Sequence, residues 1–155
     1  MIQEEGTRLT LHTFPGDLAQ CFSIIHRAFQ RDTQPLYKAI DLNVTNAYIL
    51  LLLDQQGERS QNELARTLVI NKGQITREIK RLSELGYVSQ TQSLDNRTTN
   101  VIRITDAGLK VVPKIVDIRN AWWQERLNRN HVDVNAPFAE TLEKIMDELI
   151  VRNKA

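Results

Sequence analysis

The sequence predicts a mainly α-helical fold with one small β-hairpin. Apolar residues recur every three or four positions through most of the chain, two short segments are rich in β-branched residues, and Ser, Thr, Asn and Gly stand at helix boundaries. With 155 residues, of which 41% are hydrophobic and 25% charged, the chain is long enough to form one good core. We therefore expect an ordinary globular protein.

Composition also limits the class of protein. The longest apolar run, residues 47–53, is much shorter than the ~20 residues that cross a bilayer, so no membrane partner is expected. Glu4, Glu5 and Arg8 interrupt any apolar segment near the start, which argues against a signal peptide. The single cysteine, Cys21, cannot form an internal disulfide and agrees with a reducing compartment. A cytoplasmic location is the expectation.

The first part of the chain divides into an arm and a helix. Residues 1–16 are irregular and are expected to form a loose N-terminal arm. Residues 17–44 are expected to contain a helix and a connector, with Pro35 interrupting or ending the helix. The apolar residues of this helix recur at spacings of three and four: Leu18, Cys21, Phe22, Ile25 and Phe29.

Residues 45–104 are expected to form a domain, which begins with a core helix. Thr45 is the expected N-cap of this helix, and Gly57 is the expected stop. The unbroken apolar run at 48–52 indicates that the helix is buried almost all round.

Two short helices are predicted to follow. Ser60 has the capping-box spacing to Glu63, and Asn71 can cap the next helix, which Gly86 would end in a left-handed conformation. About three residues separate the two helices. The arrangement is typical of a helix-turn-helix.

The helix from Asn71 is expected to be apolar on one side and basic on the other. Its inward side would carry Ile75, Ile79, Leu82 and Leu85. Its outward side would carry Gly73, Arg77, Lys80 and Arg81. Most basic helix faces are simply solvated, but four basic residues against Glu78 between positions 72 and 81 also suit an anionic partner.

After Gly86 the sequence pattern changes from helical to extended. Residues 87–92 and 100–104 are rich in Val, Ile, Thr and Tyr, and the polar segment 93–99 between them suits a turn. A β-hairpin directly after a helix-turn-helix is the winged-helix arrangement.

Residues 105–155 are expected to form two further apolar-striped helices. Thr105 would cap the first, which Pro113 would bend, and the second would begin near Pro137. Together with the helix in 17–44, these helices carry more apolar surface than the domain of residues 45–104 needs to complete its own core. We expect them to be N- and C-terminal dimerisation helices of a homodimer, the alternative being that they pack only on their own domain.

Several short motifs between positions 62 and 108 have a characteristic order and spacing. They are Asn62-Glu63-Leu64-Ala65, Ile75-Thr76-Arg77, Leu82, Gly86-Tyr87-Val88, Asp95-x-Arg97 and Ile104-Thr105-x-x-Gly108. Their combination resembles the multiple-antibiotic-resistance regulator (MarR) family of winged helix-turn-helix transcription factors. The resemblance implies a homodimeric regulator, most simply a repressor, that binds a pseudo-palindromic operator in double-stranded DNA and is released by a small ligand.

The resemblance also implies which residues would meet DNA. Arg97 would enter the minor groove from the wing tip, with Asp95 orienting it. In the major groove, Gln74, Thr76 and Arg77 are the expected base contacts. The expected phosphate contacts are Ser60, Gln61, Asn62, Lys72, Lys80 and Arg81.

A small aromatic or phenolic ligand is the family's common signal. The polar or aromatic residues expected to line its pocket are His26, Arg27, Tyr37, Tyr48 and Trp122. A redox signal is the alternative, because Cys21 resembles in position the reactive cysteine of the peroxide-sensing branch. The tyrosines that support that thiol are absent from the matching positions of this sequence. A thiol on the apolar side of a helix is also more often a core residue.

Other functional classes have less support. The sequence lacks a phosphate-binding glycine loop, a His-Glu-x-x-His pair and a nucleophile elbow, and its three histidines are scattered, so neither an enzyme, a metal site nor a cofactor is expected. A winged-helix module that binds protein or RNA remains an alternative, because a fold does not fix a function.

Overall fold

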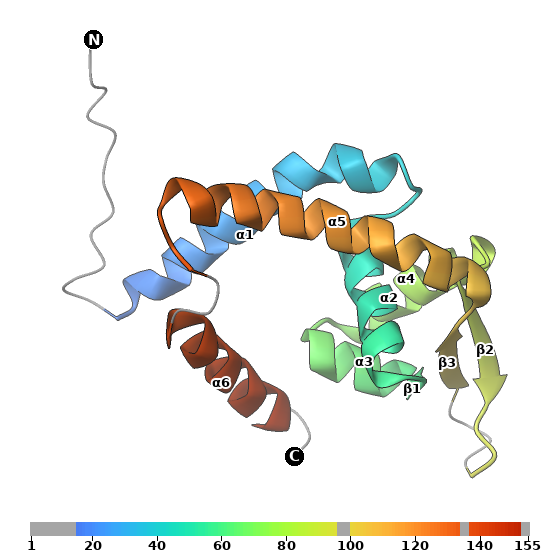
Figure 1. Ribbon diagram of the computed structural model, residues 1–155. Helices are drawn as coiled ribbons and strands as arrows, with labels where there is room; N and C mark the ends of the chain where they lie inside the picture. Colours follow the sequence, from blue (N-terminus) through green and yellow to red (C-terminus); the bar gives the residue numbers. More distant parts are fainter. Residues whose placement is uncertain (1–14, 96–99, 134–136, 153–155) are drawn as a thin grey trace. The chain divides into compact units, whose positions relative to one another are not determined.

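The computed structural model describes residues 15–95, 100–133 and 137–152 (Figure 1). Its contacts divide the chain into two units, residues 1–32 and 33–155, and each is described here by itself. The elements in chain order are α1 (Asp17–Lys38), α2 (Val44–Gln56), β1 (Arg59–Ser60), α3 (Gln61–Leu68), α4 (Lys72–Glu84), β2 (Val88–Gln92), β3 (Asn100–Ile104), α5 (Asp106–Arg129) and α6 (Pro137–Arg152). The predicted mainly helical fold with a hairpin is confirmed.

The central helix α2 is buried along most of its length, as its apolar run predicted. It packs against α3, α4, α5 and β3, so it forms the centre of the second unit. The side chains in this unit that are almost fully buried include Tyr37, Ile49, Leu50, Leu53, Leu64, Ile75, Ile79, Leu82, Ile102 and Ile115. Residues from α4, β3 and α5 thus share one core, which fixes the helix-turn-helix against the hairpin.

The N-cap of α2 is Asn43, so the prediction of Thr45 was wrong. Asn43 Oδ1 accepts a hydrogen bond from the Asn46 backbone N at 2.7 Å, and the Asn46 side chain in turn accepts from the Asn43 backbone N. An asparagine can cap and donate at the same time, and Asn43 Nδ2 also donates to Glu78 Oε2 at 3.1 Å. Threonine has no amide donor for that bond. The predicted stop at Gly57, with φ 77°, is confirmed.

Pro35 does not interrupt α1, contrary to the prediction. The helix continues to Lys38, and Ala39 N donates to Pro35 O at 3.1 Å. Proline removes only its own N–H from the helix ladder, and the cost of that loss is offset where neighbouring side chains are buried. Thr33 and Tyr37, on either side of Pro35, are 1% and 0% exposed.

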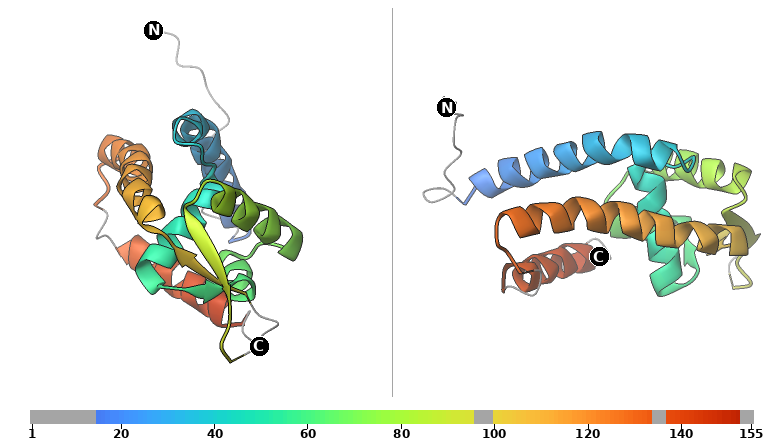
Figure 2. Two further views of the ribbon diagram at one scale, coloured as in Figure 1. Left: turned by 90° about the vertical axis from the view of Figure 1, so that its right-hand side faces the viewer. Right: turned by 45° about the horizontal axis from the view of Figure 1, so that its top comes forward.

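The hairpin belongs to a three-stranded antiparallel sheet of order β1-β3-β2. Val88 pairs with Ile104 and Gln92 with Asn100, close to the predicted strands. The additional strand β1 pairs Arg59 with Ile102; at two residues it was too short to predict from sequence. In the left view of Figure 2 the strands of the hairpin run past the ends of the helices beside them.

Val69 closes α3 in a left-handed conformation that β-branched residues rarely adopt. Its φ is 53°, its side chain is 68% exposed, and Ile70 N donates to Ala65 O across the turn. We expect Val69→Gly to raise the free energy of unfolding by about 0.5–1 kcal/mol, because relief of the strain exceeds the entropy that glycine adds to the unfolded chain. Urea denaturation would measure the change. Val69→Ala, which keeps the strained Cβ, should give no comparable gain.

Candidate nucleic-acid interface

The start of α3 is fixed by the predicted capping box. Ser60 Oγ accepts from the Glu63 backbone N at 3.2 Å, and Glu63 Oε2 accepts from the Ser60 backbone N at 2.7 Å. The hydrogen bond from the Ser60 backbone is the main cause that lowers the pKa of Glu63 below its ordinary value. The carboxylate therefore stays ionised at the positive end of the helix dipole.

The amphipathic character predicted for α4 is confirmed. Asn71 Oδ1 accepts from the Gln74 backbone N at 2.8 Å, and Gly86, with φ 75°, follows the end of the helix as predicted. Three apolar residues are buried: Ile75, Ile79 and Leu82. The outward residues are exposed: Lys72, Gly73, Thr76, Arg77, Lys80 and Arg81. The helix therefore presents a basic surface while its other side belongs to the core.

Two of the residues expected to meet DNA bind each other across the helix-turn-helix. Gln61 Nε2 on α3 donates to Thr76 Oγ1 on α4 at 2.5 Å, and Thr76 Oγ1 donates to the Lys72 carbonyl at 2.8 Å. The two helices are thus linked through side chains on the exposed surface. Spacing along the chain did not predict this pairing, because the two residues are fifteen positions apart.

A partly buried polar cluster anchors α4 on its inward side, and sequence reasoning missed it. Glu78 Oε2 accepts from Asn46 Nδ2 at 2.6 Å and from Asn43 Nδ2 at 3.1 Å. Nearby on the same helix, Arg81 donates to the Asp41 carbonyl at 3.0 Å. In the sequence alone, Glu78 is only one negative charge on a basic helix. Its role depends on two asparagines more than thirty positions away.

The hairpin is tied to both neighbouring elements. Gln90 Nε2 donates to Ser83 Oγ at 3.2 Å, which joins β2 to α4. Arg103 forms an ion pair with Glu58, which joins β3 to the segment before β1. At the end of β2, the Asp95 backbone N donates to Ser93 Oγ at 3.3 Å. Arg97 lies outside the described residues, so its predicted pairing with Asp95 remains a prediction.

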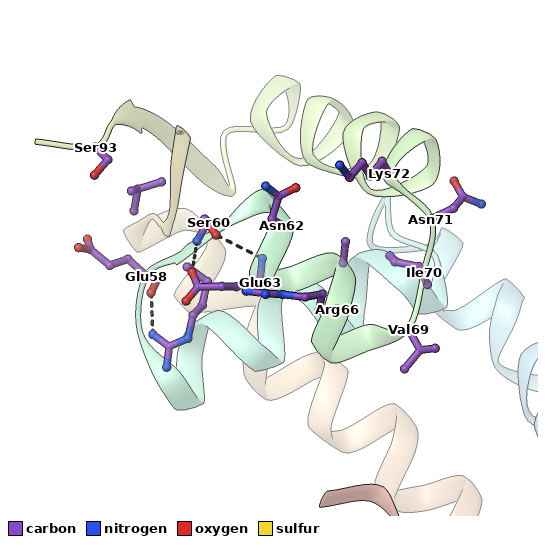
Figure 3. Close-up of a pocket in the computed structure, with 13 residues that line it drawn as sticks. Glu58, Ser60, Asn62, Glu63, Arg66, Val69, Ile70, Asn71, Lys72 and Ser93 are labelled. Carbon is purple, nitrogen blue, oxygen red and sulfur yellow. Dashed lines mark hydrogen bonds between the residues drawn. The ribbon is translucent and has the colours of Figure 1, made fainter. Parts of the chain in front are cut away.

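An open hollow of about 1030 Å³ is bordered by α3, the start of α4 and the hairpin. Figure 3 shows Asn62 of α3, Lys72 of α4 and Ser93 beyond β2 around it. Arg59 and Arg66 also line it and were not predicted. Both carboxylates of the hollow have partners, because Glu63 binds Ser60 and Glu58 binds Arg103. Three cationic side chains thus border the hollow against two carboxylates, and this small excess of positive charge suits an anionic partner.

Of the five residues predicted to line a ligand pocket, Tyr37 and Tyr48 share an environment in the second unit. Burial raises the pKa of Tyr37 to about 12, with Tyr48 adding to the rise and Arg119 opposing it. Burial also raises the pKa of Tyr48. The Tyr37 hydroxyl is fully buried and has no hydrogen-bond partner among the described residues. The sequence did not predict that Arg119 lies near these tyrosines, because no local pattern distinguishes one arginine on a long helix.

The other predicted signal residues are on α5 or in the first unit. Trp122 is buried, and the Arg126 guanidinium lies 3.7 Å from its ring centroid. In the first unit, Arg27 donates to Ser23, His26 is exposed and the Cys21 side chain is half-buried. A ligand pocket lined by all five residues remains a prediction.

The part of the chain that the structure describes also bears on other kinds of site. Within it, no group of three or more His, Cys, Asp or Glu side chains could hold a metal ion. None of its helices combines the length and apolar character that a membrane span requires.

Comparison with known proteins agrees with this geometry. A model described as the MarR family matches residues 40–97. The HTH-type transcriptional repressor IacR of Pseudomonas putida is 26% identical over 100 residues, 64% of this chain and 60% of IacR. The HTH-type transcriptional regulator Hpr of Bacillus licheniformis is 27% identical over 104 residues, 67% of this chain and 50% of Hpr. The chain thus spans about half to three-fifths of these relatives' length.

A solved structure extends the likeness to the whole fold. The MarR protein from Peptoclostridium difficile superposes with a TM-score of 0.79 at 20% identity, covering 96% of this chain and 97% of that one. The helix-turn-helix with its hairpin therefore defines a winged-helix protein. The matched segment is similar to the MarR family, which confirms the resemblance in the motifs. The relatives are named as regulators of transcription and not as enzymes, as the sequence predicted.

Proposed function

We propose that the protein is a transcriptional regulator, most simply a repressor, that binds double-stranded DNA in a sequence-specific manner. The observation that carries the proposal is the exposed basic surface of α4. A hydrogen bond on its exposed side links this helix to α3, and a hydrogen bond on its inward side links it to α2 in the core. A rigid helix with a basic outer face suits the major groove, where bases can be read. The likeness to the repressor IacR supports the regulatory role.

The contacts are divided between bases and phosphates. Gln74, Thr76 and Arg77 would meet base edges, with Arg77 able to bind a guanine through two hydrogen bonds. Phosphates would be met by Ser60, Gln61, Asn62, Lys72, Lys80 and Arg81, and also by Arg59 and Arg66 from the hollow. One guanidinium nitrogen of Arg81 already binds Asp41, so its other donors would serve DNA. Arg97, oriented by Asp95, would enter the minor groove.

A homodimer would present two such domains to a pseudo-palindromic operator. In support, α6 carries several large apolar side chains that are exposed in the single chain: Phe138, Leu142, Ile145, Met146 and Leu149. A two-fold dimer would cover such a surface and would set two α4 helices about one helical turn of DNA apart. The oligomeric state in solution tests this part of the proposal.

The signal that releases DNA would be a small aromatic or phenolic ligand. The buried, unpartnered hydroxyl of Tyr37 beside Tyr48 supports a polar contact within an apolar site. The alternative signal, oxidation of Cys21, is tested by alkylation of the native protein, since a buried core thiol would react slowly or not at all.

Selection of bound sequences from random duplex DNA is the most direct test. We expect a pseudo-palindrome whose half-sites lie about one helical turn apart. Competition of the selected duplex with RNA then separates a DNA regulator from an RNA-binding module. Selection without enrichment, or binding that does not respond to salt, would contradict the proposal.

Lys80 provides a quantitative check on the phosphate contacts. Its side chain is 78% exposed and lies 4.0 Å from Glu84, so its removal should leave the fold intact. We expect Lys80→Ala to weaken binding to all sequences by a similar factor and to lower the slope of log affinity against log salt by about one. Lys144→Ala is the matched control, because Lys144 is 73% exposed, pairs with Glu140 four positions away and lies on α6. An unchanged slope for Lys80→Ala would exclude the contact.

A further inference from the structure

The hydroxyl group of Thr76 is fully engaged as a donor within the protein. Thr76 lies on the exposed side of α4, yet its Oγ1 donates to the Lys72 carbonyl at 2.8 Å. The same oxygen accepts from Gln61 Nε2 at 2.5 Å. A hydroxyl has one hydrogen to donate, so Thr76 has none left for another acceptor.

This restricts what Thr76 can recognise in a major groove. The groove presents acceptors at guanine N7 and O6, adenine N7 and thymine O4, and each of these requires a donor. The two hydrogen bonds also hold the side chain in one rotamer, since both would break if χ1 rotated. The oxygen keeps one acceptor lone pair, which could meet only the amino groups of adenine N6 or cytosine N4, and the methyl group is the part of this side chain that remains for an apolar contact with a base.

We propose that Thr76 determines specificity through its methyl group, by packing against the C5-methyl of a thymine. The inference rests on the proposed function and deepens it, since it assigns one base to one side chain. Thymine is the only unmodified DNA base with a methyl group in the major groove, and threonine methyls are suited to it. Gln61 is then a positioning residue: one amide hydrogen orients Thr76, and the second remains for a phosphate.

Uracil substitution tests the proposal, because it removes only the C5-methyl and leaves every hydrogen-bonding group in place. Each thymine of the selected duplex is replaced in turn by uracil, and affinity is measured for the full-length wild type and two variants. For the wild type we expect one thymine per half-site whose replacement weakens binding about fourfold, the loss that one buried methyl group explains. Other thymines that α4 does not touch should show no such effect.

Two near-isosteric variants separate the methyl from the hydroxyl. Thr76→Ser keeps the hydroxyl and loses the methyl, so it should bind the thymine and uracil duplexes equally. Thr76→Val keeps a methyl and loses the hydroxyl, so it should retain the preference for thymine whatever its overall affinity. Far-UV circular dichroism melts show whether each variant is folded at the temperature of the assay.

The opposite pattern would overturn the inference. If Thr76→Ser retained the thymine preference and Thr76→Val lost it, the hydroxyl would be the reading group. If the wild type bound the duplex but showed no thymine dependence at any position, the inference would fail while the proposed function stood. Absence of binding to any duplex would contradict both the inference and the proposed function, so the two failures are distinguishable.

Discussion

Replacing Gly108 with alanine is expected to lower the free energy of unfolding by about 3 kcal/mol. An ideal Cβ at this position would lie 2.3 Å from the Tyr87 carbonyl oxygen and 2.7 Å from Ile104 Cγ1. The nearest atom belongs to the backbone, so no side-chain rotation can relieve the overlap. The first turn of α5 would have to move away from the segment that follows α4.

That movement would open the junction between α4 and the hairpin. Thr105 N donates to the Tyr87 carbonyl at 3.0 Å, and Thr105 Oγ1 donates to the Gly86 carbonyl at 2.6 Å. Thr105 also caps α5 by accepting from Gly108 N at 3.1 Å. The end of α4, the end of β3 and the start of α5 therefore meet at one point, and all three would be disturbed.

Urea denaturation of Gly108→Ala at a protein concentration matched to wild type would measure this loss. Gly73→Ala on α4 is the matched control. A Cβ on Gly73 would have only Asn71 Oδ1 nearby, at 3.5 Å, so alanine should stabilise this exposed helical position by about 0.5–1 kcal/mol. Changes of the same sign at both glycines would contradict the steric explanation.

Replacing Asn46 with alanine is expected to cost about 2–3 kcal/mol of stability. Asn46 is fully buried, and its Nδ2 donates to Glu78 Oε2 at 2.6 Å. Alanine would remove this donor and leave the carboxylate in a partly buried site with Asn43 as its other side-chain partner. A charged acceptor that loses a buried donor is costly, because water cannot fully replace the bond.

Thermal and urea unfolding of Asn46→Ala would test the cost, with Gln55→Ala on the exposed end of α2 as a control that should stay within about 0.5 kcal/mol of wild type. Asn46→Asp sharpens the test. It sets a second carboxyl group beside Glu78, so the pKa of the pair should rise on folding. Its destabilisation should be largest at neutral pH and should shrink as the pH falls and one carboxyl takes up a proton. A deficit independent of pH would exclude the direct contact.

The sequence by itself determined the elements and most of their boundaries. Ser60, Asn71, Thr105, Gly57 and Gly86 were recognisable because caps and left-handed stops act through backbone groups only a few residues away. The buried and exposed sides of α4 followed from helical periodicity for the same reason. The motifs also indicated the resemblance to the MarR family, which the match over residues 40–97 confirmed.

Only the tertiary structure decided how the elements are joined. Asn43 is the N-cap in place of Thr45 because its side-chain amide also donates a hydrogen bond to Glu78 on α4. Helix α1 continues beyond Pro35 because buried residues stabilise its last turns. The strand β1 exists because β3 lies beside it. In each case the deciding partner is distant along the chain, so no local pattern contains it.

The same limit applies to the candidate interface. Composition and periodicity predicted a basic outer surface on α4, but not that Gln61 would occupy the hydroxyl of Thr76, nor that Arg59 and Arg66 would border the same hollow as Lys72. A hydrogen bond between two side chains is made or lost when the donor–acceptor distance changes by a few tenths of an ångström. The tertiary fold sets that distance, and the spacing of residues along the chain does not. The chemistry of each contact therefore required the fold.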